Sequence, residues 1–75
     1  MKEQIAEIFS TLFDMEISVD SNISMDNNEE WTSIKHIEII VTLEDELGVK
    51  FKTGDIPKMT SLKKIIEYLE DNSND

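Results

Sequence analysis

Apolar side chains recur at helical spacing near both ends of the chain. The stretch 2–14 carries them at positions i, i+3, i+4, i+7 and i+8, which are Ile5, Ile8, Phe9, Leu12 and Phe13. The stretch after Ser61 repeats the first four of these spacings with Leu62, Ile65, Ile66 and Leu69. This period is typical of amphipathic helices with one face on a core. It predicts a helix over 2–14 and a last helix capped by Ser61, which frays into a polar tail over 71–75.

A third apolar stretch, Ser33–Leu47, contains neither glycine nor proline and is followed by Gly48, the residue best suited to a left-handed helix end. At about 100° per residue, this predicted helix has two apolar faces roughly 120° apart. One face holds Ile39, Ile40, Leu43 and Leu47, and the other holds Ile34, Ile37 and Val41. A single core needs only one of them. We therefore expect the second strip to lie at a groove edge or under a partner, with extra core as the alternative.

The segment Met15–Thr32 shows no sustained period and is rich in Ser, Asn, Asp and Glu. It predicts a long loop in which Val19, Ile23 and Met25 serve as apolar anchors, with disorder as the alternative. Connections of this length are uncommon in small domains, which favours a functional or partner-facing role.

After Gly48, Val49 and Phe51 predict a brief extended piece. The segment Thr53–Lys58 predicts a turn that leads into at most one helical turn, because it combines glycine, aspartate and proline. The predicted fold class is all-α, a small bundle of three main helices plus a short fourth helical turn, with the long loop between helices one and two. A chain of 75 residues has room for a single domain, 1–75.

Charge narrows the possible partners. The chain has 17 acidic side chains, seven lysines and no arginine, which gives a net charge of -10. Binding of nucleic acid through phosphate contacts is therefore not expected. Residues 1–47 hold 12 of the acids and only two lysines, whereas residues 48–75 hold five of each. This asymmetry indicates either a solvated surface or a docking surface for basic partners.

Compartment and membrane signals are weak or absent in the sequence. The longest apolar run, residues 39–41, is far short of the ~20 residues that span a bilayer. The first ten residues carry acids where a signal peptide carries an apolar stretch. The lack of cysteine fits a reducing compartment and excludes a thiolate zinc site, a disulfide scaffold and a cysteine nucleophile. We expect a soluble, cytoplasmic monomer without membrane association.

Two other candidate sites lack part of what their chemistry requires. Side-chain oxygens alternate along 20–28 as at the start of an EF-hand loop, but Met25 and Trp31 occupy the places of the required glycine and glutamate, so no metal site is expected. His36 follows Ser33 by three residues, which suggests a nucleophile with its base. A bundle of this size has few residues with which to enclose a pocket that excludes water, so an enzyme is not expected. We expect His36 to be a partly buried first-turn residue that packs toward the loop.

The most informative segment is 29–34, where a polar loop ends in Ser33 at the very start of a helix that carries an unexplained apolar strip. A serine in this place is usually a helix cap. Here Thr32, Ser33 and Ile34 match the Asp-Ser-Leu that opens the second helix of acyl and peptidyl carrier proteins. The match continues through 35–38 into 43–49, similar to that family's Leu-Glu-x-Glu-Phe-x-Ile stretch. The chain resembles this family from end to end, and Trp31 and His36 beside the site make it most similar to discrete carriers of specialised pathways.

The resemblance implies that a 4'-phosphopantetheine arm is attached to Ser33 and carries acyl or aminoacyl intermediates as thioesters between enzymes of a biosynthetic pathway. The chain itself would catalyse nothing. The implied partners are a phosphopantetheinyl transferase, an acyl- or aminoacyl-activating ligase, and downstream acyl-transferring or synthase enzymes. The implied docking residues are Thr32, Ile34, Ile37, Glu38, Val41, Glu44 and Asp45. The alternative function is an unmodified acidic protein-interaction domain of the same fold, in which Ser33 only caps the helix.

The site departs from the family pattern at Thr32, which stands where the family has aspartate. Threonine still caps a helix, yet it presents no negative charge to a basic transferase. Lys35 adds a positive charge close to the site. Together these two residues predict a narrow choice of partners.

Overall fold

The computed structural model describes residues 1–72 and contains three α-helices and one short 3-10 helix. These are α1 (Lys2–Phe13), α2 (Ser33–Leu47), η1 (Thr53–Lys58) and α3 (Leu62–Asn72). Within these residues there is no strand, and the one sheet-like pairing is an isolated antiparallel bridge between Ser24 and Ser61. The all-α prediction is therefore confirmed. The structure contains no helix, among the residues it describes, whose length and apolar character suffice to cross a bilayer.

The first and last helices form where the apolar period predicts them. In α1, Ile5, Ile8, Phe9 and Phe13 are buried, and Asp14 ends the helix in the left-handed conformation with φ 52°. Leu12 is only half-buried at the edge of the core. In α3, the four periodic residues Leu62, Ile65, Ile66 and Leu69 are all buried.

The capping of α3 is confirmed, but its predicted end is not. The Ser61 hydroxyl accepts a hydrogen bond from the Lys64 N–H at 3.1 Å. The helix continues through Asp71 to Asn72, two residues into the predicted polar tail. The rest of the predicted tail, 73–75, lies outside the described residues. Backbone hydrogen bonding therefore extends α3 beyond its apolar face.

The second helix separates its two apolar faces as the sequence predicts. Ile39, Ile40 and Leu43 are buried, and Leu47 is half-buried. Gly48 ends the helix with φ 66°, a conformation that costs glycine nothing. The other strip, Ile34, Ile37 and Val41, is exposed. Its alternative interpretation as extra core is therefore wrong.

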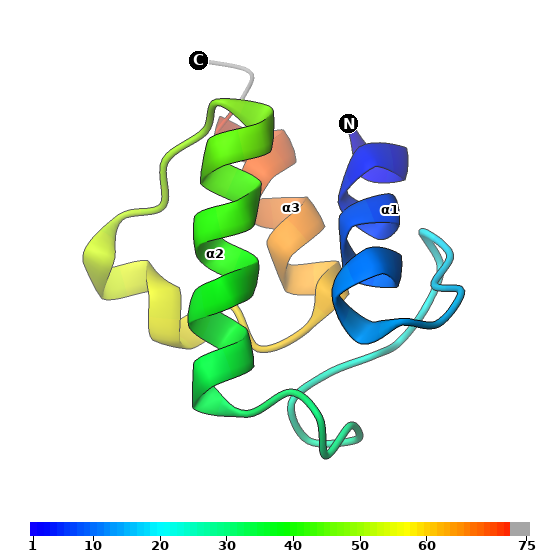
Figure 1. The fold of residues 1–75 in the computed structure, drawn as a ribbon. Coiled ribbons are helices and arrows are strands. Elements are labelled where there is room, and N and C mark those ends of the chain that lie inside the picture. Colours follow the sequence, from blue (N-terminus) through cyan, green and yellow to red (C-terminus); the bar gives the residue numbers. More distant parts are fainter. Residues whose placement is uncertain (73–75) are drawn as a thin grey trace.

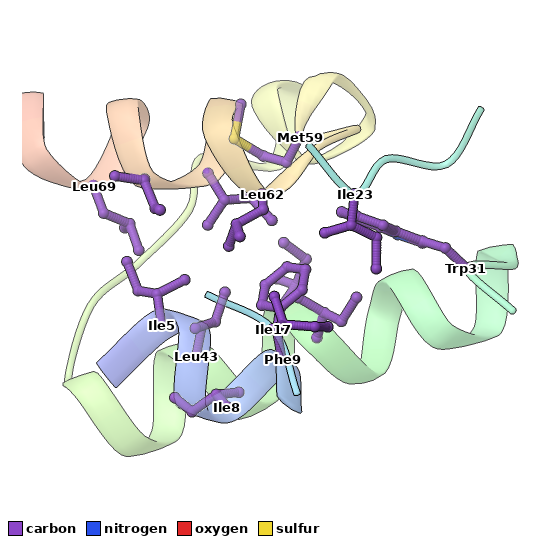
Figure 2. Packing of buried hydrophobic residues seen from close by; sticks show 14 of the residues in the cluster. Ile5, Ile8, Phe9, Ile17, Ile23, Trp31, Leu43, Met59, Leu62 and Leu69 are labelled. Atoms are coloured by element: carbon purple, nitrogen blue, oxygen red, sulfur yellow. The ribbon is translucent and has the colours of Figure 1, made fainter. Parts of the chain in front are cut away.

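The long loop between α1 and α2 is anchored at several points. Ile23 is buried as predicted, whereas Val19 and Met25 are only half-buried. Two anchors were not predicted, Ile17 and Trp31, and both are buried. The amide oxygen of Asn27 accepts from the Ser24 N–H at 2.9 Å, which stabilises the turn at the tip of the loop. Figure 2 shows Ile17, Ile23 and Trp31 packed with the helical core residues.

The loop is also tied to the start of α3. The Met25 N–H donates to the carbonyl of Thr60 at 2.9 Å, and the Leu62 N–H donates to the carbonyl of Ile23 at 3.1 Å. Figure 1 shows the result, in which α1 ends, α2 begins and α3 begins at the same end of the bundle, beside the loop. The start of α2 therefore has the loop on one side and η1 on the other.

The segment between α2 and α3 contains more helix than predicted. η1 is a 3-10 helix of six residues, longer than the single turn expected from its glycine and proline. Side chains outside the segment hold it in place. Tyr68 stacks on Phe51 with ring centroids 5.3 Å apart, and its hydroxyl donates to Asp55 at 3.0 Å. Proline fits here because a short 3-10 helix requires few backbone donors.

Candidate functional site

The cap of α2 is Thr32, not Ser33. The backbone of Thr32 is extended, and its hydroxyl accepts from the Lys35 N–H at 3.2 Å. Its carbonyl accepts from the His36 N–H at 2.8 Å. These are the bonds of an N-cap residue, which makes Ser33 the first residue inside the helix. The idea that Ser33 caps the helix, which belonged to the alternative function, is therefore wrong.

The Ser33 side chain is exposed, and its hydroxyl forms no hydrogen bond with any other described residue. The N–H groups of Ser33 and Ile34 precede the first helical hydrogen bond, and they too have no acceptor within residues 1–72. The first turn of α2 carries no acid. Free N–H groups at the positive end of a helix favour an anion. An anionic group on the Ser33 oxygen would therefore be stabilised by its surroundings.

An apolar strip runs along α2 from this serine. Ile34 is 84% exposed, Ile37 is 56% exposed and Val41 is 57% exposed. At about 100° per residue, Ser33 and the three apolar residues fall within a sector of roughly 100°. At about 1.5 Å per residue, the strip extends roughly 12 Å along the helix. The structure therefore brings the predicted attachment residue and the predicted apolar docking residues onto one face.

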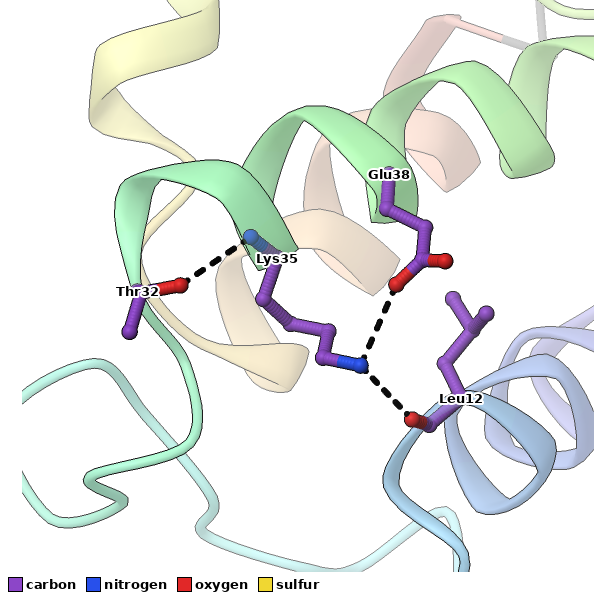
Figure 3. Close-up of polar contacts among 4 residues, drawn as sticks. All are labelled: Leu12, Thr32, Lys35 and Glu38. Atoms are coloured by element: carbon purple, nitrogen blue, oxygen red, sulfur yellow. Dashed lines mark hydrogen bonds and ion pairs between the residues drawn. The ribbon is translucent and has the colours of Figure 1, made fainter.

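The Lys35 side chain packs against the end of α1, with 25% of it exposed. Its ammonium donates to the carbonyl of Leu12 at 3.0 Å and pairs with Glu38 at 3.1 Å, as Figure 3 shows. It also lies 5.6 Å from the centroid of the Phe13 ring. α1 has no basic residue in its own last turn, so Lys35 supplies the cation that stabilises this helix end. The charge expected to influence partner choice is thus partly used within the fold.

The three predicted acidic docking residues differ in their availability. Asp45 is exposed. Glu38 keeps 51% of its side chain exposed while it pairs with Lys35. Glu44 is half-buried, and its carboxylate accepts from the Phe51 N–H at 2.9 Å. The chain reverses after Gly48 and brings that N–H back to α2, a contact that helical spacing alone could not reveal.

A buried bridge closes over the start of α2. Trp31 is 3% exposed and His36 is 6% exposed. The Trp31 Nε1–H donates to His36 Nδ1 at 3.0 Å, and His36 Nε2 lies 2.8 Å from the carbonyl oxygen of Ile56 in η1. His36 does pack toward the loop as expected, but it is buried more deeply. Because both of its ring nitrogens are hydrogen-bonded, His36 is not available as a base for Ser33.

Trp31 and His36 occupy the positions that flank an N-cap residue, one before it and four after it. Apolar pairs at these positions often fix the angle at which a chain enters a helix. The spacing of five residues around Thr32 is the signal that would have predicted the contact from sequence. The hydrogen bond and the link to η1 depend on the tertiary fold.

A separate groove lies between α1 and α2. It has a volume of about 360 Å³, and its apolar lining consists of Ile8, Leu12 and Leu47. On α2 it is lined by Thr42, Glu46 and Leu47, so it does not include the first turns of the helix. Within residues 1–72, no three His, Asp or Glu side chains come together as ligands for a metal ion. Comparison of the chain with models of known families, with curated proteins and with solved structures found no match.

Proposed function

We propose that this chain is an acyl carrier protein that carries acyl or aminoacyl intermediates as thioesters on a 4'-phosphopantetheine arm attached to Ser33. One observation carries the proposal. The Ser33 hydroxyl is exposed at the first residue of α2, while Thr32 supplies the cap that a serine in this place ordinarily provides. Ser33 thus has no structural bond to give up on modification. The resemblance of the Thr32, Ser33, Ile34 junction to the carrier family identifies the modification.

The residues around Ser33 fit the phosphodiester of such an arm. The unbonded N–H groups of Ser33 and Ile34 lie at the positive end of α2, where an anion gains about 0.3 to 1 kcal/mol. When bound, the arm supplies a thiol for thioester formation, which this cysteine-free chain lacks. Ser33 holds the arm, and the rigid helix behind it fixes where the arm leaves the surface.

The apolar strip supports a second part of the proposal, the docking of partner enzymes. Ile34, Ile37 and Val41 form its centre, with Thr32, Glu38 and Asp45 around them, whereas Glu44 also serves the fold. A carrier visits a transferase, a loading ligase and downstream acyl-transferring enzymes in turn. Weak contacts steered by charge suit this task, because they speed association without tight binding. The acidic surface of residues 1–47 provides such steering toward basic partners.

Intact mass tests the proposal directly. The chain is co-expressed with a broad phosphopantetheinyl transferase and weighed, as the parent, as Ser33→Ala and as Ser61→Ala. Ser61 is a matched control because it also stands at a helix start, but its hydroxyl caps α3. We expect the parent and Ser61→Ala to gain the mass of one arm and Ser33→Ala to gain none. Modification that survives in Ser33→Ala would overturn the assignment.

The alternative function, an unmodified interaction domain, is favoured by one observation, the exposure of the apolar strip itself. It needs no chemistry at Ser33. A parent that takes no arm from any transferase, yet still binds partners in a manner sensitive to Ile37, would favour this alternative. A gain of one arm at Ser33 would exclude it.

A further inference from the structure

The bridge between Trp31 and His36 requires one form of the imidazole. An indole Nε1–H only donates, so the His36 Nδ1 that it contacts at 3.0 Å must carry a lone pair. A backbone carbonyl only accepts, so the His36 Nε2 that lies 2.8 Å from the Ile56 oxygen must carry the proton. Both bonds together are satisfied by the neutral ring with its hydrogen on Nε2.

The bridge closes a short segment of chain that contains Ser33. Trp31 precedes the cap residue and His36 is the fourth residue of α2, so Ser33 lies within the short segment that their hydrogen bond closes. Through Ile56, the same ring ties this segment to η1. Three separate elements are therefore held together by one side chain: the end of the loop, the first turn of α2, and η1.

The bridge is also packed against α1. The Trp31 ring lies edge-on to Phe9 at 5.4 Å and tilted to Phe13 at 5.8 Å, and it stacks on the His36 ring at 6.0 Å. A polar group that loses its partner in so buried a place is costly, because water does not replace the bond. The arrangement is therefore sensitive to the hydrogen-bonding form of His36.

Charged groups on the surrounding elements form no ion pair with His36. In η1, Asp55 accepts from Tyr68 and lies 3.9 Å from Lys58. In α2, Lys35 pairs with Glu38. In the loop, Glu30 is exposed. No ion pair to His36 exists within residues 1–72, so no carboxylate is in place to stabilise a charged ring.

We infer that His36 is a positioning residue for Ser33, whose neutral form holds the start of α2 for modification and whose protonation releases it. A proton on Nδ1 replaces the acceptor for Trp31 with a second donor, so the two N–H groups oppose each other. The end of the loop then separates from the first turn of α2. The inference rests on the proposed function, because it assigns the bridge a role in attachment of the arm.

Intrinsic fluorescence can follow this event, because the chain has a single tryptophan and a single histidine. The parent and His36→Gln are titrated from about pH 8 to pH 5, the range in which histidine changes charge. Glutamine can still donate to the Ile56 carbonyl but does not titrate. We expect a sigmoidal change in Trp31 emission in the parent that is absent from His36→Gln. Parent emission that is flat, or that changes equally in the variant, would overturn release by protonation.

The rate of arm attachment tests the positioning role. Trp31→Phe removes the donor and keeps an aromatic ring, whereas Ser10→Ala removes the hydroxyl that accepts from the Ile17 N–H at 2.9 Å, at the opposite end of the loop from the bridge. Circular dichroism confirms that both variants fold. At neutral pH we expect Trp31→Phe to lower the initial rate at least about threefold, since fewer molecules present Ser33 correctly. Ser10→Ala should stay within about 1.5-fold of the parent.

The two proposals fail in different ways. Equal rates for the parent and Trp31→Phe, or equal losses in Trp31→Phe and Ser10→Ala, would overturn the positioning role while leaving Ser33 as the attachment site. A parent that takes no arm would overturn the proposed function and the positioning role with it. The fluorescence titration needs no transferase, so it decides the protonation of the bridge in either case.

Discussion

Ile37 and Ile39 provide a matched pair for testing which face of α2 stabilises the fold. They are the same residue type, two positions apart in the middle of one helix, yet Ile37 is 56% exposed and Ile39 is fully enclosed. Replacement of each by alanine deletes the same atoms and changes helix propensity equally. The difference in the free energy of unfolding therefore measures burial alone.

The expected magnitudes follow from those exposures. Ile39→Ala removes a fully buried side chain and leaves a cavity, which costs about 2 to 5 kcal/mol. Full burial of an isoleucine contributes about 1.5 to 3 kcal/mol, and Ile37 has less than half of its surface buried. Alanine also returns a few tenths of a kcal/mol in helix propensity. We therefore expect Ile37→Ala to cost less than about 1 kcal/mol.

Urea unfolding followed by circular dichroism at fixed salt measures both values, because a domain of this size usually unfolds in two states. Ile39→Val, with an expected loss of about 0.5 to 1.5 kcal/mol, replaces Ile39→Ala if that variant does not fold. Equal losses at Ile37 and Ile39 would show that the exposed strip is core. If Ile37→Ala is stable, its slower reaction with a partner enzyme is then a direct measure of docking.

Three further predictions concern the charges and the cap. Thr32→Asp should keep the cap and raise the free energy of unfolding by about 0.3 to 1 kcal/mol. A broad transferase should also modify this variant faster than the parent. Equal rates with every transferase would show that Thr32 plays no part in recognition. Lys35→Met should lower the free energy of unfolding by about 1 kcal/mol, because it removes the cation from the end of α1; an unchanged urea midpoint would contradict that role. Added salt should raise the melting temperature by screening the 12 acids of residues 1–47, and a flat or falling response would show that they repel too weakly to matter.

Elements with a strong period were predictable from the sequence. α1 and α3 follow from apolar residues three and four apart, and the end of α2 follows from Gly48, whose φ of 66° disfavours other residues. The loop was harder to predict because burial there follows no period. Ile17 and Trp31 enter the core only because the fold brings α1 and the loop together.

In the candidate site, too, some features were predictable from the sequence and others depend on the tertiary fold. The exposure of Ile34, Ile37 and Val41 was one of the two outcomes predicted, because a single core needs only one apolar face of α2. The role of Glu44 was not, since its acceptor function depends on where Phe51 returns after the turn. Likewise the partner of Lys35 is a carbonyl 23 residues earlier in the chain, and no local pattern indicates such a contact.

The two backbone bonds that tie the loop to the start of α3 have a consequence for hydrogen exchange. Amides in a surface loop normally exchange quickly, but the Met25 and Leu62 N–H groups are bonded across the loop to Thr60 and Ile23. Their exchange requires the loop to detach, so their protection reports that opening separately from unfolding of the helices. The rate of deuterium uptake at the Met25 N–H thus measures how often the loop beside the candidate site opens while the helices stay folded.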